Sequence, residues 1–270
     1  MKANTLQRLF IFVLAASLTA CASMKSDSPA PATQGLEVGT GLAAELSSAN
    51  RPAEDKARDA DRKPAELMQF FGVKSGMTTV DIIALGGYVT EVLSVAVGPK
   101  GKVYAQNPPI ALQLRDGMYA KAITERLANN RLPNVVRLDK PLNQMGLEPN
   151  SLDGAVAFMV LHDFFWLSQD VPGVLKAVHK ALKPGGWFGV VDHAAAAGTG
   201  AEQAKDRDNG THRIEEAYVK KIFGDAGFVL EASNDVLRNP ADDHTKPFYD
   251  ESFRGKSTDR FVLRFRKKSN

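Results

Sequence analysis

The sequence predicts an α/β fold in which a mostly parallel sheet of seven strands, with an antiparallel last strand, carries helices on both faces. Apolar, β-branched runs alternate with segments of helical periodicity, and glycine turns separate several of them. No helical segment lies between the last two runs, which favours an antiparallel final pair. The chain has 270 residues, 44% hydrophobic and 24% charged. This size and composition suit one α/β domain with extensions or two small domains.

The first 20 residues have the pattern of a signal peptide. Lys2 and Arg8 precede an apolar run over 9–18, and small residues then lead to Cys21, the sole cysteine of the chain. A single cysteine excludes a disulfide framework or a thiolate metal cluster within the chain. The segment resembles the lipobox of bacterial lipoproteins. An ordinary secretory signal with an incidental cysteine is the alternative.

The lipobox resemblance implies that Cys21 carries a lipid that anchors the protein to the outer membrane, facing the periplasm. Residues 21–40 are rich in Ser, Ala, Pro, Thr and Gly and are expected to form a flexible tether before a domain over 41–270. The net charge is +3, and removal of Lys2 and Arg8 leaves 3 − 2 = +1. This balance predicts no nucleic-acid partner.

The domain begins with helical segments. Residues 51–63 alternate in charge and favour a solvated helix with local ion pairs. The alternative is that this helix lies over the mouth of a cleft and offers Arg58 or Arg62 to a ligand. A new helix begins at Pro64.

A strand, a glycine turn and a helix follow. Val80, Ile82 and Ile83 suit a strand buried on both faces, and the turn contains Gly86 and Gly87. The helix then shows a single apolar face at Val89, Val92, Leu93 and Ala96. Such a turn leaves backbone N–H groups exposed at the helix start, where ligands often bind.

The rest of the domain continues the alternation. Further strands are expected over 102–105, 134–138, 152–158, 187–191, 228–232 and 259–265, and helices over 111–127, 169–182 and 216–226. In the last strand Phe261, Leu263 and Phe265 are expected to point inward, with Arg260, Val262 and Arg264 outward. We expect the basic residues of this strand to protect a sheet edge.

Three local motifs resemble the Rossmann-like fold of class I S-adenosylmethionine-dependent methyltransferases. They are GMTTVD at 76–81, SLDGAV at 151–156, and LKPGG at 182–186 followed by a strand that ends at Asp192. The resemblance covers residues 50–268. The chain also resembles a bacterial branch of this family known only as predicted methyltransferases. This resemblance lies in the short sequences at 192–193, 211–214 and 242–244. The resemblance implies methyl transfer from S-adenosylmethionine to an unknown small-molecule substrate.

The resemblance also implies where the cofactor binds, since ligands of open parallel sheets lie beyond the carboxyl ends of the strands. The expected cofactor-binding residues are those of the first turn, those ending the second strand and one beyond the third: Asp81, Ala84, Leu85, Gly86, Gly87, Tyr88, Gln106, Asn107 and Asp139.

Two departures from the family pattern support a second hypothesis. Ile83 and Leu85 stand at two of the three glycine positions of the first motif, and Gln106 and Asn107 stand where Asp or Glu is usual. Side chains at the glycine positions compete with the cofactor for space. The alternative is therefore a catalytically inactive methyltransferase-fold lipoprotein that serves as a binding or scaffold module.

Four polar residues at predicted strand ends are candidate catalytic groups. His162 and Asp163 follow the fourth strand, His193 follows the fifth, and His212 precedes the next helix. A histidine there can remove a proton from a methyl acceptor near neutral pH. A hydrogen-bonding role in fixing loops is the alternative for each. Their spacing matches no compact metal-binding motif, so the sequence predicts no metal site.

Overall fold

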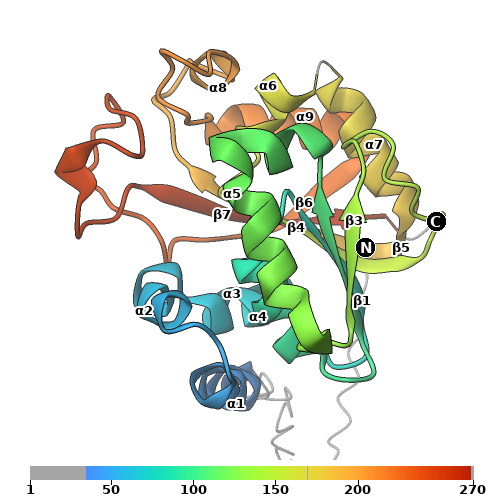
Figure 1. Ribbon diagram of the computed structural model, residues 1–270. Helices are drawn as coiled ribbons and strands as arrows, with labels where there is room; N and C mark the ends of the chain where they lie inside the picture. The colour runs from blue at the N-terminus through green and yellow to red at the C-terminus, as the bar shows by residue number, and fades with distance from the viewer. Residues whose placement is uncertain (1–34, 169, 269–270) are drawn as a thin grey trace, which may run out of the picture. The chain divides into compact units, whose positions relative to one another are not determined.

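A seven-stranded sheet forms the centre of the fold, in the order β3-β2-β1-β4-β5-β7-β6 (Figure 1). The strands are β1 (Thr78–Ile82), β2 (Lys102–Asn107), β3 (Val135–Asp139), β4 (Leu152–Phe158), β5 (Leu182–His193), β6 (Phe228–Asn234) and β7 (Arg260–Lys267). Strands β1 to β5 pair in parallel, whereas β7 pairs antiparallel with β5 and β6. The predicted fold class is confirmed.

This computed structural model describes residues 35–168 and 170–268. The predicted signal peptide, the lipid-attachment residue Cys21 and most of the predicted tether lie outside the described residues. The first helix, α1 (Gly35–Ser48), begins inside the 21–40 segment assigned to the tether. No proline lies between Pro31 and Pro52, so the backbone there can be helical. Among the described residues, no helix combines the length and the apolar character needed to cross a membrane.

Helices cover both faces of the sheet. They are α2 (Ala53–Arg62), α3 (Pro64–Phe71), α4 (Tyr88–Val97), α5 (Pro109–Leu127), α6 (Phe164–Leu167), α7 (Val171–Ala181), α8 (Glu202–Lys205) and α9 (Glu216–Asp225). Side chains of α1, α3 and α4 form the apolar core on one face, and side chains of α7 and α9 form the core on the other. Alternate residues of β4 serve both cores, with Val156 and Phe158 in the first and Ala155 and Ala157 in the second.

Strand β7 lies inside the sheet, between β5 and β6. Phe261, Leu263 and Phe265 face one core as expected. Val262 is only 1% exposed and belongs to the opposite core, while the buried Arg260 forms an ion pair with Asp61 at the end of α2. The prediction that the basic residues of this strand protect a sheet edge is therefore wrong, because the chain places β6 at the edge and packs β7 between two strands.

Helix α5 is interrupted where the sequence predicts one continuous helix. Arg115, Asp116 and Gly117 have φ values of 52°, 54° and 77°, which are left-handed and divide the helix into two parts. The glycine explains one of these positions, and the local sequence offers no periodicity signal for the other two. The break brings the second half of α5 beside the carboxyl end of β1, where Arg126 donates to the carbonyl of Gly86 at 2.5 Å.

Candidate active site

A cavity of about 600 Å³ opens at the carboxyl ends of β1 and β4. Most of the residues predicted from the sequence to bind cofactor or act in catalysis line it: Asp81, Ala84, Leu85, Gly86, Tyr88, His162, Asp163, His193 and His212. Gly87, Gln106, Asn107 and Asp139 are not among its lining residues. The position agrees with the rule that ligands of open α/β sheets bind beyond the carboxyl ends of the strands.

The turn between β1 and α4 keeps a glycine-type backbone at all three motif positions. Ile83, Leu85 and Gly87 have φ values of 53°, 50° and 82°. A left-handed conformation is unusual for leucine and rarer still for a β-branched residue, and each such position costs about 1–3 kcal/mol. At Gly87 a Cβ atom would lie 2.8 Å from side-chain carbons of Ile123 and Arg126. The third motif position therefore requires glycine, whereas the first two carry strain.

The amides of Gln106 and Asn107 stabilise this strained backbone. Gln106 Oε1 accepts from Ile83 N at 3.1 Å, and Asn107 Oδ1 accepts from Leu85 N at 2.8 Å. Their nitrogens donate to the carbonyls of Lys140 and Leu85 at 2.7 and 3.3 Å. Both residues are fully buried. The expected role of these amides in binding a cofactor ribose is therefore corrected by their placement, because every polar side-chain atom already has a protein partner.

Two further residues predicted at the cofactor site also lie away from the cavity lining. Asp139 pairs with Arg137 at 2.8 Å on the outer strand β3. Gly87 directly precedes α4, and its left-handed backbone ends the turn. The side chain of Leu85 packs partly against the apolar core and also lines the cavity. Leu85 therefore narrows the space next to the turn.

Asp81, the last polar residue of β1, is a buried carboxyl group at the base of the turn. It is 2% exposed and lies opposite Ala105 of β2 and Val156 of β4. Its Oδ2 accepts a hydrogen bond from Thr90 Oγ1 at 2.6 Å. Burial raises the pKa of Asp81 to about 7, although the Thr90 hydrogen bonds act in the opposite direction. A cationic ligand group in the cavity would stabilise the ionised form.

Arginines of α2 surround one end of the cavity. The guanidinium groups of Arg62 and Arg58 lie 4.6 and 5.0 Å from the ring centre of Tyr88, whose hydroxyl donates to Asp59 at 2.7 Å. Both arginines line the cavity. Within the described part of the chain, Arg62 forms no ion pair, and burial together with Arg58 lowers its pKa. The alternative that α2 offers Arg58 or Arg62 to a ligand agrees with this placement.

The opposite end of the cavity holds an aspartate–histidine pair that is almost fully buried. Asp192, the penultimate residue of β5, accepts from the backbone N of His162 at 2.8 Å and lies 2.7 Å from His162 Nδ1. The other ring nitrogen, Nε2, lies 3.4 Å from Asp163 Oδ1. Burial lowers the pKa of His162, but the carboxylates of Asp192 and Asp163 outweigh it and raise the pKa to about 9.

His193 is the neutral member of the histidine group. Its Nδ1 lies 2.7 Å from Thr258 Oγ1, and its ring stacks on Phe248 with centroids 4.4 Å apart. Burial, together with the positive charge on His162, lowers the pKa of His193 well below its usual value. At neutral pH His162 therefore holds a proton, while His193 can accept one.

His212 comes from the segment before α9 and reaches the same place. Its ring centroid is 5.9 Å from that of His162, and its Nε2 lies 2.7 Å from the carbonyl oxygen of Arg207. The sequence prediction that the four candidate catalytic residues gather at neighbouring strand ends agrees with these positions.

Sequence reasoning missed several cavity residues. Phe248 and Tyr249 line the cavity from the long segment before β7, and Thr258 binds His193. That segment carries no periodicity, and its run at 242–244 does not indicate that Phe248 and Tyr249 approach the cavity. Arg126 of α5 was also missed, although it pairs with Asp55 at 2.7 Å and lines the cavity beside the turn.

Comparison with known proteins agrees with the fold. The methyltransferase domain family matches residues 103–190. No curated protein sequence matches the chain. The structure of a SAM-dependent methyltransferase from Aquifex aeolicus has a TM-score of 0.57 and 22% sequence identity, and the match covers 81% of this chain and 100% of that one.

Two other solved structures are similar over the same domain. A Galdieria sulphuraria protein described as a sarcosine dimethylglycine methyltransferase has a TM-score of 0.57 and 15% identity, covering 86% of this chain and 99% of that one. The [4+2]-cyclase SpnF has a TM-score of 0.56 and 15% identity, covering 78% and 82%. The chain therefore has the seven-stranded, Rossmann-like fold of class I methyltransferases. The activity carried by that fold has to be argued from the site.

Proposed function

We propose that this protein is an S-adenosylmethionine-dependent methyltransferase that acts on a small molecule. The observation that carries the proposal is a single cavity that joins the turn after β1 to His162 after β4 and His193 at the end of β5. Its volume of about 600 Å³ lies within the range typical of small-ligand sites, roughly 300–1,000 Å³. The match of residues 103–190 to the methyltransferase domain family supports the same function.

The charges around the turn fit the amino-acid end of the cofactor. S-adenosylmethionine carries a carboxylate, an ammonium group and a sulfonium. Arg62 supplies a guanidinium without an ion-pair partner among the described residues, and Asp81 supplies a buried carboxyl group. Residues 84–86 line the same cavity. The ribose end lacks the usual carboxylate, because Gln106 and Asn107 hold the turn instead.

The histidines would handle the proton of the methyl acceptor. When bound, the cofactor supplies an electrophilic methyl group for a single in-line displacement. His193 Nδ1 is engaged by Thr258, so Nε2 is the ring nitrogen available to take a proton. His162, protonated on both ring nitrogens near neutral pH, would orient an acceptor by donating a hydrogen bond. The largest contribution of the chain is positioning of the acceptor.

A second function, a methyltransferase-fold binding module without catalysis, is favoured by one specific observation. The side chain of Leu85 lines the cavity at a position where the family presents bare backbone. Together with the buried amides of Gln106 and Asn107, it removes two of the usual contacts of the cofactor. The solved [4+2]-cyclase of similar fold shows that the architecture also supports other chemistry.

Calorimetric titration separates the two functions. The full chain in detergent is titrated with S-adenosylmethionine and, separately, with S-adenosylhomocysteine. Saturable binding of both supports the methyltransferase, and no binding at millimolar ligand contradicts it. Leu85→Gly is expected to bind more tightly, roughly fivefold for each kcal/mol of added binding free energy. Leu230→Gly, on the exposed edge strand β6, is the matched control and should leave the affinity unchanged. Weaker binding by Leu85→Gly would show that its side chain supports the cofactor site.

We also propose that a lipid on Cys21 holds the protein in the outer membrane, facing the periplasm. The support is the lipobox-like sequence, which lies outside the described residues. Cys21→Ser is expected to prevent incorporation of labelled palmitate and to move the protein from the membrane to the soluble fraction. Unchanged membrane association of Cys21→Ser contradicts the anchor.

A further inference from the structure

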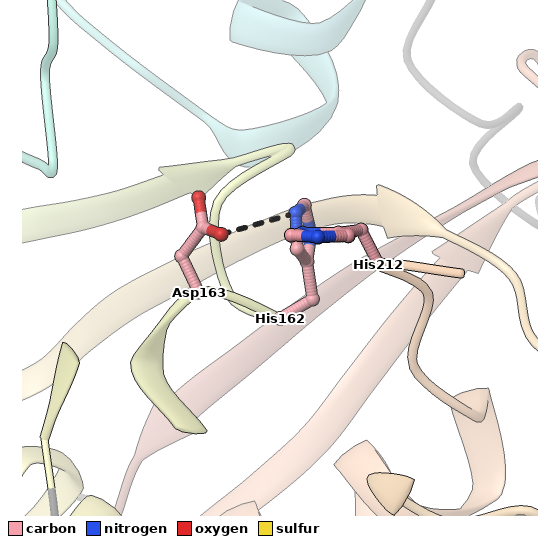
Figure 2. A group of neighbouring side chains, drawn as sticks. All are labelled: His162, Asp163 and His212. Atoms are coloured by element: carbon pink, nitrogen blue, oxygen red, sulfur yellow. Dashed lines mark ion pairs between the residues drawn. The ribbon is translucent and has the colours of Figure 1, made fainter. Parts of the chain in front are cut away.

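Three side chains converge at the histidine end of the cavity in a way that resembles a metal-binding site. His162, Asp163 and His212 each offer one ligand atom, and these atoms all lie within 4.8 Å of one another (Figure 2). His162 Nε2 and Asp163 Oδ1 are 3.4 Å apart. Two ligand atoms of a tetrahedral ion with bonds of about 2.1 Å are separated by roughly 3.4 Å. The pair already has the spacing that an ion requires.

His162 is oriented as a metal ligand would be. A carboxylate only accepts hydrogen bonds, so the 2.7 Å contact with Asp192 places a proton on His162 Nδ1 and turns Nε2 towards Asp163. Asp192 also accepts the backbone N–H groups of His162 and His193, at 2.8 and 2.7 Å. An aspartate that fixes the tautomer and direction of a histidine is the usual outer partner of a histidine ligand.

The other two side chains have outer partners of the same kind. His212 Nε2 donates to the backbone carbonyl of Arg207 at 2.7 Å, which leaves Nδ1 with its lone pair. Asp163 Oδ1 accepts from the indole N–H of Trp166, also at 2.7 Å. A backbone carbonyl behind a histidine and a donor behind a carboxylate are typical of metal sites. Each histidine thus keeps one ring nitrogen for coordination, and Asp163 keeps further lone pairs on its carboxylate beside the hydrogen bond from Trp166.

We propose that His162, Asp163 and His212 bind a divalent transition-metal ion of the zinc class. Two imidazoles and one carboxylate match the ligand types that such ions prefer. The sequence-based expectation of no metal site considered only spacing along the chain, where His212 is 50 positions beyond His162. The fold closes that separation, because both loops lie at the carboxyl end of the sheet.

An ion held by three protein ligands keeps a coordination position open. His162, Asp163 and His212 all line the cavity, so the open position faces the space that a substrate would occupy. The ligand expected there has an anionic oxygen or sulfur atom, since the ion lowers the pKa of a bound hydroxyl or thiol. The ring centroid of Phe248, which also lines the cavity, lies 5.5 Å from that of His162. Binding of the ion displaces the proton from His162 Nε2, so in the ion-bound chain this nitrogen coordinates the ion and does not donate a hydrogen bond to a methyl acceptor.

The test uses the full chain in detergent, without a histidine tag, stripped with a chelator and titrated with zinc chloride by calorimetry. We expect one zinc ion to bind per chain. His212→Asn removes the imidazole while tolerating the left-handed backbone of that position, where φ is 52°. It is expected to weaken zinc binding at least roughly tenfold. Asp163→Asn should weaken it similarly. His179→Ala, on α7 and outside the cavity lining, is the matched control and should bind as the unchanged chain does.

Cobalt titration gives a second readout that does not depend on affinity alone. One equivalent of cobalt(II) should give visible absorption bands from nitrogen and oxygen ligands, and His212→Asn should lose them. Two outcomes overturn the site: no saturable zinc binding, or equal weakening by His179→Ala and His212→Asn. S-adenosylmethionine is titrated separately into the zinc-free chain, so failure of the metal site and failure of the proposed methyltransferase are distinguished.

Discussion

Two regions line the same cavity but present different groups to it. In the turn after β1, the side chains of Gln106 and Asn107 hold a backbone whose left-handed residues are Ile83 and Leu85. At the end of β5 and in the loop after β4, the carboxylate of Asp192 accepts the backbone N–H groups of His162 and His193 and also contacts the ring of His162, and all three residues are buried. The first region presents main chain to a ligand, and the second presents titratable groups.

This contrast indicates where each kind of function is vulnerable. Changes in the turn should alter stability and the space for a ligand, because the turn depends on backbone conformation and close packing. Changes in the histidine loops should alter protonation and metal binding, because the carboxylates of Asp192 and Asp163 raise the pKa of His162, and the positive charge on His162 helps to lower the pKa of His193. Substitutions in each region can separate these two behaviours.

The largest expected effect is a pH-dependent loss of folding stability caused by the buried Asp81 below the turn. Its pKa rises from 3.8 to about 7 on folding, so between these values the native state holds a proton that the unfolded state has released. Stability therefore falls as pH rises through this window and stays lower above it, by about 4 kcal/mol. Asp81→Asn should remove that loss. Urea unfolding at pH 4 and pH 8 measures the difference between variant and unchanged chain, and an equal difference at both values contradicts the prediction.

The histidine loops should respond in a different pH window. The pKa of His162 rises from 6.5 to about 9, so its contribution to stability is complete below 6.5 and is lost as pH rises through 9. In zinc-free protein the free energy of unfolding should fall by about 3 kcal/mol across this window. Asp192→Asn should remove most of the pH dependence between these values and lower the pKa of His162. Nuclear magnetic resonance titration of the His162 ring checks the assignment, and an unchanged pKa in Asp192→Asn would sink it.

A third effect isolates close packing in the turn from backbone strain. Gly87 and Gly76 have nearly equal φ values, 82° and 83°. A Cβ at Gly87 would lie 2.8 Å from two side-chain carbons, whereas a Cβ at Gly76 would meet nothing within 4 Å. Gly76→Ala should lower the free energy of unfolding only by the cost of placing alanine in a left-handed conformation. Gly87→Ala should lower it by about 2 kcal/mol more, because its Cβ also meets neighbouring side chains. Urea unfolding of both variants measures this, and equal losses would mean that the side chains near Gly87 move aside freely.

The smallest effect tests whether Asn107 holds Leu85 in its left-handed conformation. Asn107→Ala removes both hydrogen bonds to the backbone of Leu85. The loss of stability should be larger by about 1 kcal/mol when Leu85 is present than when it is replaced by glycine, which adopts the conformation without support. A double-mutant cycle with Asn107→Ala and Leu85→Gly measures the coupling. Additive losses of stability would show that the Asn107 amide stabilises the turn equally whether leucine or glycine occupies position 85.

Local patterns were sufficient for most of the fold. The strand over 152–158 has the predicted bounds, and the runs around Val80 and Trp187 are buried strands of the sheet. These predictions succeed because hydrophobic periodicity reports burial residue by residue. The prediction for β7 failed in part, because alternation along a strand does not tell which strand lies beside it. The break in α5 was missed because Arg115 and Asp116 have ordinary helical propensities.

The order of the elements, the glycine at position 87 and the presence of histidines at strand ends are properties of the sequence alone, since they follow from local periodicity and turn chemistry. The tertiary fold was needed to establish that Gln106 and Asn107 bind the turn rather than a ligand. It was also needed to bring His212 to His162 and Asp163, because only the strand order places such distant loops at one edge. The physical reason is that hydrogen-bond partners and pKa values depend on neighbours in space, which the chain acquires only when the sheet forms.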